Sequence, residues 1–538
     1  MSGAGPSQGA KAPSGGQRST RSGKRGGQMN VSATVADPDP SLPPLVGEFD
    51  TVADALAAAA RQFADREAYV DGEQRLSYAQ WYRAADGLAR RFIDSGVKPG
   101  DVVMIYIPSS IDYAVCYAAA ALAGAVATGI NMRLGPREIT AILAKATPTL
   151  VVMEDRAVLP SMAEGLRILR RGELAAATTG PGLGEARPRR RADDPAVIIW
   201  TSGTTGSPKG AWFDHRNLQA AVHSAGVMTH AFDRKLPSTP FAHAGYMAKL
   251  WDQLAFGITV VVSTVPWSAS EMLRQMREER VTLGAGVPTQ WSKLLQLPEL
   301  DEVPLPDLRL CVTATAPAAP ELVEQITRRL KCPMISRYAM TESPSISGTS
   351  PGDDPLVLYR TVGKPQRGTE VRITDDEGHP VPAGTVGRIR TRGPCVMRGY
   401  WREPELTRAT ISDDGWLLSG DLAYVDDAGN LVLVGRVNDM YIRGGYNVYP
   451  LEVENVLVEH PGVAQASVVG LKAPVIGEVG VAFIVPGDPQ AAPSLEELRA
   501  WCKERLADYK APDRIEILAQ LPLTEMLKID KTALRAGL

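Results

Sequence analysis

The sequence predicts a layered α/β protein with mostly parallel strands, followed by a smaller α+β domain. Up to about Gly363, short apolar runs typical of buried strands alternate with amphipathic helical patterns. After that point the sequence alternates and is rich in turn residues, which favours antiparallel strands or a small barrel-like part. A chain of 538 residues is long enough to form two or more domains, each with its own core.

The first expected helix covers residues 50–65, where Val52, Leu56, Ala59 and Phe63 share one face. Asp50 or Thr51 is its expected cap. Buried strands are predicted from "VVMIYI" (102–107), "LVVM" (150–153) and "AVIIW" (196–200). Amphipathic helices are predicted at 269–281, 319–330 and 494–509.

Composition narrows the class of protein. Hydrophobic residues make up 44% of the chain and charged residues 22%, as in ordinary globular proteins, and the net charge of −3 gives no overall attraction to nucleic acid. The cysteines are odd in number and scattered, with no metal-ligand spacing, so neither a disulfide framework nor a zinc site is expected. A reducing, cytoplasmic location fits this pattern. The cysteines are Cys116, Cys311, Cys332, Cys395 and Cys502.

Two segments could be mistaken for membrane or targeting elements. Residues 1–45 are rich in Gly, Ser, Lys and Arg near the start and lack an apolar signal-peptide core, so a disordered extension is expected, with a basic contact arm as the alternative. The run "YAVCYAAAALAGAVATGI" (113–130) approaches the length of a membrane span, but Ala and Gly contribute little to insertion. We expect a buried helix that leads into a buried strand, and no integral membrane segment.

The stretch "WTSGTTGSPKG" (200–210) directly follows a predicted strand. Glycine lets a backbone approach a ligand closely, and consecutive N–H groups in such a loop bind anions. The hydroxyls and a lysine add further donors, so a polyphosphate is the natural ligand. The spacing differs from that of P-loop NTPases, and a linker remains the alternative on composition alone. The candidate phosphate-binding residues are Thr201, Ser202, Gly203, Thr204, Thr205 and Lys209.

This stretch resembles the phosphate-loop signature of the adenylate-forming superfamily, which contains acyl-CoA synthetases, peptide-synthetase adenylation domains and luciferases. Four further stretches match in the family's order, and the resemblance extends from about Phe49 to the end of the chain. They are "RYAMTE" (337–342), "GWLLSGDL" (415–422), "GRVNDMYIRGGYNVYPLEVE" (435–454) and "LPLTEMLKIDK" (521–531).

The resemblance implies an enzyme that uses ATP, Mg²⁺ and coenzyme A. A carboxylate attacks the α-phosphorus of ATP to give an acyl-adenylate, and a thiol then displaces AMP. It also implies a large N-terminal domain at 46–434, a hinge at 435–439 and a small mobile C-terminal domain at 440–538. No nucleic-acid partner is expected, and the substrates are a small-molecule carboxylic acid, or its adenylate, and coenzyme A.

Residue roles in the nucleotide site follow from the same resemblance. Tyr338 corresponds to the aromatic residue that stacks on adenine, and Thr341 to an α-phosphate contact. Asp421 corresponds to the carboxylate that accepts both ribose hydroxyls, and Arg436 approaches the ribose from the interdomain side. Glu342 is the expected Mg²⁺ ligand, which suits a hard cation beside phosphate oxygens.

Other roles belong to the C-terminal motifs. Lys528 corresponds to the lysine that steadies the carboxylate and the α-phosphate during adenylation. Arg443, Gly444 and Gly445 resemble the loop that receives the pantetheine arm of coenzyme A. Asn438 occupies the hinge position, where a residue that tolerates large φ/ψ changes is suited.

The acyl pocket is expected around His243, which matches a histidine beside the family's acyl site. Ala242 and other small residues in "PFAHAGYMAKLW" leave room for a bulky, mostly apolar acid, although small residues could also mark close helix packing. A polycyclic acid, an aryl acid and a fatty acid all remain possible. The expected lining residues are Ala242, His243, Tyr246, Ala314 and Ala339.

The sequence departs from the family pattern where glycines are usual. Ala314 and Thr315 replace two glycines near the nucleotide, Ala339 replaces one in "YAMTE", and Leu527 replaces one before Lys528. Glycine is used where φ is positive or a ligand approaches closely. We therefore hypothesise that adenylation is weakened and that thioester formation is the more secure half-reaction, against the alternative that neighbouring residues compensate.

The leading interpretation is an acid–thiol ligase that forms CoA thioesters. One alternative is a thioester-forming enzyme that receives an acyl-adenylate from a partner adenylating enzyme. A further alternative is an acyl-AMP ligase that loads a carrier protein. A third, of another class, is a degenerate nucleotide-binding protein, against which the presence of Lys528, Glu342 and Asp421 argues.

Overall fold

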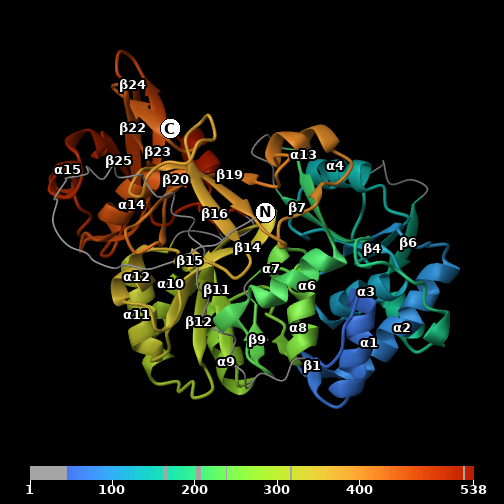
Figure 1. Ribbon diagram of the computed structural model, residues 1–538. Coiled ribbons are helices and arrows are strands. Elements are labelled where there is room, and N and C mark those ends of the chain that lie inside the picture. The colour runs from blue at the N-terminus through green and yellow to red at the C-terminus, as the bar shows by residue number, and fades with distance from the viewer. Residues whose placement is uncertain (1–44, 161–165, 202–206, 238, 315–317, 525–527) are drawn as a thin grey trace, which may run out of the picture. The chain divides into compact units, whose positions relative to one another are not determined.

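In the computed structural model, the described residues are 45–538 without 161–165, 202–206, 238, 315–317 and 525–527. The α/β prediction is confirmed, because helices alternate with two large, mainly parallel sheets (Figure 1). The helices are α1 (Val52–Gln62), α2 (Tyr78–Asp94), α3 (Ile111–Leu122), α4 (Pro136–Ala146), α5 (Leu174–Thr178), α6 (His215–His223), α7 (Ala244–Met247), α8 (Leu250–Phe256), α9 (Ala269–Glu278), α10 (Pro288–Leu295), α11 (Pro320–Leu330), α12 (Pro355–Arg360), α13 (Pro404–Thr410), α14 (Pro450–Val458), α15 (Leu495–Lys503) and α16 (Lys531–Ala536).

The first large sheet contains the expected buried strands at 102–107, 150–153 and 196–200. Strands β7, β4, β3, β5 and β6 pair in parallel, whereas β8 is antiparallel to β7 and to the edge strand β18. In spatial order it comprises β18 (Gly399–Tyr400), β8 (Lys209–Asp214), β7 (Pro195–Thr201), β4 (Val126–Gly129), β3 (Val102–Tyr106), β5 (Leu150–Met153) and β6 (Arg167–Arg170).

The second large sheet has six strands in parallel, flanked by antiparallel strands at both ends. Its strands β12 and β13 run in register, with Thr313 beside Ser336 and Ala314 beside Arg337. In spatial order it comprises β15 (Lys364–Pro365), β14 (Ser343–Gly348), β13 (Met334–Met340), β12 (Leu310–Ala314), β11 (Leu283–Gly286), β9 (Arg234–Leu236), β10 (Thr259–Val261), β1 (Glu67–Asp71) and β2 (Gln74–Ser77).

After Gly363, where the sequence becomes alternating and rich in turn residues, the structure changes from parallel to antiparallel strands. The following residues form a four-stranded antiparallel sheet of β16 (Glu370–Thr374), β17 (Gly387–Arg392), β19 (Leu417–Val425) and β20 (Leu431–Arg436). The last part combines α14, α15 and α16 with a mixed sheet of β22 (Tyr446–Val448), β21 (Tyr441–Arg443), β24 (Gly477–Pro486), β23 (Val463–Ala473) and β25 (Arg514–Ile517). The domain and hinge boundaries stay predictions, and residues 1–44 of the expected extension lie outside the described residues.

Helix α1 illustrates how local sequence sets local structure. Its predicted inner face is buried, and Thr51 is the cap, since the Thr51 hydroxyl accepts the Asp54 N–H over 3.2 Å. Helices α1, α2 and α3 pack on one another and bury a common core (Figure 1). Helix α3 and strand β4 carry the run at 113–130, and both are buried, as expected. Among the described residues, no helix is long and apolar enough to cross a membrane.

All five cysteines are buried and free of disulfide bonds. Two of the parallel strands end at predicted site residues. Strand β7 ends at Thr201, and β13 ends at Met340, one residue before Thr341. In open α/β sheets, ligands bind at such strand ends. The fold therefore positions the candidate site at this edge.

Candidate active site

The two ends of the expected phosphate loop lie on neighbouring strands. Thr201 ends β7 and pairs in register with Lys209, the first residue of β8. Both are half-buried. Ser202, Gly203, Thr204 and Thr205, which the sequence places at the tip of the loop, lie outside the described residues. The Lys209 ammonium lies 5.7 Å from the centre of the Tyr400 ring, so the loop's cation faces the next group of the site.

Tyr400 contacts both the Lys209 ammonium and Glu342, the expected magnesium ligand. Its hydroxyl donates to Glu342 Oε1 over 2.8 Å, and Glu342 is only 9% exposed. Burial and the Glu342 charge raise the pKa of Tyr400, which keeps the phenol protonated and donating. Sequence reasoning missed Tyr400, and the only signal for it was an aromatic residue after Gly399. Thr341 is half-buried beside Glu342.

Glu342 fits a magnesium ion in the way that nucleotide enzymes use one. Mg²⁺ is commonly held by one or two carboxylates together with substrate phosphates and water. The Glu342 backbone is fixed by the Met397 N–H, which donates to its carbonyl over 2.9 Å. Within the described residues, no group of three or more His, Cys, Asp or Glu side chains is arranged to hold a metal by protein ligands alone. An ion at Glu342 would therefore depend on the substrate's phosphates.

Asp421 is the centre of the predicted ribose site. Its Oδ2 accepts the Tyr338 hydroxyl over 2.7 Å, and its Oδ1 accepts Arg436 Nε over 3.0 Å. Asp421 and Arg436 face each other in register on β19 and β20, and Tyr338 is 7% exposed. Because a carboxylate oxygen can accept more than one hydrogen bond, Asp421 retains capacity for further donors. Structure and sequence thus agree in bringing these three residues together.

Lys528, from the closing motif, reaches the same group. Burial and the Arg436 charge lower its pKa, whereas the Asp421 carboxylate opposes that effect. The Thr524 N–H donates to the Lys528 carbonyl over 2.7 Å, which holds the Lys528 backbone. Leu527 lies outside the described residues. A lysine far along the chain thus lies within electrostatic range of the ribose-site residues.

His243 also lies within electrostatic range of Lys528. It precedes α7, and its Nε2 is 3.4 Å from the Asn131 amide nitrogen. Burial and the Lys528 charge lower the His243 pKa to about 4, so the ring is neutral at physiological pH. A neutral imidazole beside a cation can position a carboxylate without adding charge.

Of the five predicted acyl-pocket residues, Ala242 lines a cavity in the structure, whereas His243, Tyr246, Ala314 and Ala339 are not among its lining residues. Ala242 lines a cavity of about 170 Å³ together with residues such as Ile107, Asn131 and Trp267. Tyr246 is not among the residues that line this cavity: its ring stacks on Phe241 at 3.8 Å, and its hydroxyl bonds to that of Tyr69 over 2.7 Å. The ring and the hydroxyl of Tyr246 both contact core residues, so Tyr246 belongs to the core and not to the cavity lining.

The glycine replacements leave an unstrained backbone where they are described. Ala314 is half-buried at the end of β12, and Ala339 is exposed on β13. Neither has a positive φ. The strain that a lost glycine could impose is therefore absent at both. Thr315, like Leu527, lies outside the described residues.

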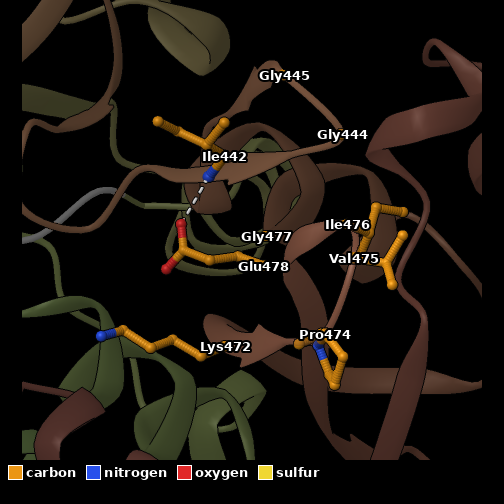
Figure 2. A pocket seen from close by; sticks show the side chains of 10 residues that line it. Ile442, Gly444, Gly445, Lys472, Pro474, Val475, Ile476, Gly477 and Glu478 are labelled. Atoms are coloured by element: carbon orange, nitrogen blue, oxygen red, sulfur yellow. Dashed lines mark hydrogen bonds between the residues drawn. The ribbon is translucent and has the colours of Figure 1, made fainter.

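The expected pantetheine loop is the turn of the β21–β22 hairpin. Gly444 and Gly445 have φ of +57° and +86°, a conformation that favours glycine. They border an open groove of about 640 Å³, opposite the turn at 474–476 (Figure 2). Arg443 is held by Asp513 through two hydrogen bonds of 2.9 and 2.6 Å, so its first role is to brace the hairpin. Asn438 is exposed in the turn between β20 and β21.

The structure thus brings the predicted ribose-site residues together and forms a separate hairpin from the predicted pantetheine loop. The family model of the AMP-binding enzyme matches residues 56–401, and that of the AMP-binding enzyme C-terminal domain matches 452–528. The chain belongs to the AMP-binding enzymes, and it is an acid–thiol ligase, as the sequence motifs predicted.

Relatives and solved structures agree with this assignment. The chain is 36% identical to a feruloyl-CoA synthase of Amycolatopsis over 86% of this chain and 94% of that protein. It is 34% identical to a 3-[(3aS,4S,7aS)-7a-methyl-1,5-dioxo-octahydro-1H-inden-4-yl]propanoyl:CoA ligase of Mycobacterium tuberculosis over 91% and 99%. The crystal structure of MatB from Rhodopseudomonas palustris with ATP bound matches with a TM-score of 0.82 and 29% identity, over 90% of this chain and 98% of that one.

Proposed function

We propose that the protein converts a bulky carboxylic acid to its CoA thioester through an acyl-adenylate. The observation that carries the proposal is that Lys528 lies within electrostatic range of Asp421, Arg436 and His243. A cation between a ribose site and an acyl pocket is where the acid and the α-phosphate would meet. Adenylation brings two anionic groups together, and such a cation stabilises the developing charge.

The residues around Lys528 have separate roles in this proposal. Asp421 accepts the ribose hydroxyls, while Tyr338 and Arg436 hold its carboxylate in place. Glu342, oriented by Tyr400, holds Mg²⁺, which would neutralise charge on the phosphates. The phosphate loop and Lys209 bind the pyrophosphate that leaves. Neutral His243 positions the acid.

The second step uses the hairpin at Gly444 and Gly445. The thiol sulfur of coenzyme A attacks the acyl carbonyl, the bond to AMP breaks, and the thiol proton is released to solvent. Glycines leave the hairpin free of side chains, so a thin pantetheine arm can pass. The relatives' names support a bulky acyl group, because feruloyl and hydrindane-propanoyl groups both carry rings.

A two-arm assay tests the proposal against the thioester-only alternative. Purified protein receives a ring-bearing acid with ATP, Mg²⁺ and coenzyme A, and in parallel the matching synthetic acyl-adenylate with coenzyme A alone. Mass spectrometry follows the acyl-CoA. Product in both arms is the expected result, since Ala314 and Ala339 lie in unstrained strands. Product from the adenylate alone would contradict it and favour a partner adenylating enzyme.

A carrier-protein acceptor is tested in the same experiment. Phosphopantetheine attached to a carrier protein replaces coenzyme A in a third arm. The groove beside Gly444 and Gly445 is open, so both thiols are sterically admissible. Faster product formation with coenzyme A is expected, and a strict requirement for the carrier would identify an acyl-AMP ligase.

A further inference from the structure

The end of the predicted phosphate loop is held by a lysine from another part of the chain. Lys145 belongs to the last turn of α4. Its Nζ donates to the Pro208 carbonyl over 2.7 Å and to Glu403 Oε1 over 3.0 Å. Pro208 directly precedes Lys209, and Glu403 lies three residues after Tyr400. One side chain thus joins the two segments that carry Lys209 and Tyr400.

These two segments are neighbours in the first large sheet, where β18 pairs antiparallel with β8. The Trp401 N–H extends the pairing, because it donates to the Gly210 carbonyl over 2.7 Å. Pro208 lies two residues before Gly210, and Glu403 lies two residues after Trp401. Lys145 therefore forms the next link of the pair, at the end that leads into the phosphate loop.

A second polar contact joins α4 to the same segment. Arg402 Nη1 donates to the hydroxyl of Thr147, the C-cap residue of α4. Arg402 has a φ of +58°, a conformation that is costly for residues other than glycine and persists only where the surroundings impose it. Glu403 is the N-cap residue of α13, and α4 and α13 lie beside each other (Figure 1). The contacts of α4 therefore help to hold this turn in one shape.

The contacts of Lys145 suit positioning better than stabilisation of the fold. The Lys145 and Glu403 side chains are 26% and 28% exposed, and ion pairs that water reaches contribute little to stability. Glu403 Oε2 has no hydrogen-bond partner within the described part of the chain, so Lys145 is the group that orients this carboxylate. Pro208 is buried, and the Lys145 ammonium satisfies its carbonyl.

The groups next to this link belong to the nucleotide side of the site. The Lys209 ammonium lies 5.7 Å from the centre of the Tyr400 ring, and the Tyr400 hydroxyl donates to Glu342 Oε1 over 2.8 Å. Pro208 and Lys209 share a peptide bond, so a shift of the Pro208 carbonyl moves Lys209 as well. A displacement of about 1 Å in a catalytic group can cost about 10²-fold in rate. A contact of modest strength can therefore have a large effect at this place.

We propose that Lys145 is a positioning residue for adenylation, because it holds Lys209 where the pyrophosphate end of ATP binds. This inference rests on the proposed function, in which Lys209 binds the leaving pyrophosphate. The partners of Lys145 are the Pro208 carbonyl and the Glu403 carboxylate, so Lys145 acts through the protein and not on the substrate. Loss of Lys145 should weaken the grip on the β- and γ-phosphates, whereas AMP binding and thioester formation should change little.

Half-reaction kinetics test the proposal in the full-length protein. Lys145→Met keeps a long side chain and removes the charge and the donor. It should raise the KM for ATP and lower the rate of pyrophosphate release, each by about tenfold. Thioester formation from a synthetic acyl-adenylate should stay within about 2-fold. Lys145→Arg can donate to both acceptors and should recover most of the loss. Equal losses in both half-reactions, or an unchanged KM for ATP, would overturn the proposal.

Lys235→Met is the matched control, because Lys235 also pairs with a carboxylate, that of Asp252, over 2.9 Å. The Lys235 and Asp252 side chains are only 16% and 6% exposed, so this variant should lose more melting temperature than Lys145→Met. It should leave the KM for ATP within about 2-fold of the wild type. A rise in this KM as large as that in Lys145→Met would mean that any lost ion pair has the same effect, and the proposal would be wrong.

Nucleotide binding separates this inference from the proposed function. α,β-Methylene-ATP with Mg²⁺, and AMP, are each titrated by calorimetry into the wild type and Lys145→Met. Affinity for the ATP analogue should fall about tenfold in the variant, because a contact between a charged group and a phosphate is lost, and affinity for AMP should stay within about 2-fold. This result supports the inference even if no thioester forms, an outcome that would contradict the proposed function alone. An unchanged ratio of the two affinities would overturn the inference whatever the activity.

Discussion

The nucleotide side and the acyl side of the site differ in how their charges are partnered. On the nucleotide side, Asp421 is held by Tyr338 and Arg436, and Glu342 by Tyr400. On the acyl side, burial and the Lys528 charge keep His243 neutral, and Ala242 lines a cavity of about 170 Å³. ATP is the same in every turnover, so a network that is fixed in advance suits it. The acyl side instead offers a cavity and a neutral imidazole rather than fixed charge.

Lys528 lies within electrostatic range of Asp421, Arg436 and His243, and its removal should have the largest effect. We expect Lys528→Ala to reduce adenylation by about 10³-fold, because it removes the charge that stabilises the transition state. Thioester formation from a synthetic acyl-adenylate should change only a few-fold. Pyrophosphate release measures the first half-reaction, and acyl-CoA formation the second.

Lys531→Ala is the control for this substitution. Lys531 lies three residues further along and pairs with Glu454 over 2.7 Å, outside the groups discussed above. It should leave both half-reactions within about 2-fold. Equal losses of both half-reactions in Lys528→Ala would show that the lysine does not distinguish the two steps.

Glu342→Gln tests whether the fixed network serves a cation. The amide keeps the shape but loses the charge, so we expect a loss of about 10²-fold in pyrophosphate release at limiting Mg²⁺. Excess Mg²⁺ should restore part of it. Tyr400→Phe removes only the orienting hydrogen bond and should cost several-fold. A Mg²⁺ titration curve that is the same in Glu342→Gln and wild type would exclude Glu342 as the ligand.

The sequence predicted the nucleotide side better than the acyl side, for a physical reason. The face of α1 and the residues of the five motifs follow from local spacing, which the chain displays directly. The partners of a charge do not: Lys235 is paired with Asp252 and Lys249 is not, although both are lysines in similar surroundings. Tyr246 found its partner in Tyr69, 177 positions away. Pairing depends on tertiary neighbours, so these contacts emerged only from the structure.

The neutral state of His243 gives a smaller effect, on stability. Its folded pKa is about 4, below the unfolded value of about 6.5, so the unfolded chain binds more protons between these pH values. Stability should therefore fall as pH drops from about 7 toward 4, by at most about 3 kcal/mol from this residue. His243→Gln should lose less melting temperature over that range than the wild type.

His215 provides an internal reference for this measurement. Its pKa is also lowered to about 4 by burial, and its Nδ1 accepts the Val52 N–H over 3.2 Å, far from Lys528 in the sequence. It remains in the His243→Gln variant, so part of the acid sensitivity should persist. Identical pH profiles of melting temperature in the two proteins would mean that His243 is not held neutral.

Ala339→Gly should have the smallest effect, and it tests whether the nucleotide side was weakened by the loss of its glycines. Ala339 lies in β13 without a positive φ, so glycine offers no geometry that alanine lacks. A glycine within a strand costs about 0.5–1 kcal/mol of stability through chain entropy. We expect adenylation, followed by pyrophosphate exchange, to stay within about 2-fold and the melting temperature to fall slightly. If the adenylation rate of Ala339→Gly were tenfold or more above that of the wild type, Ala339 would be displacing the motif at 337–342. The hydrogen-bonded residues of the nucleotide side would then be held in a less active arrangement in the wild type.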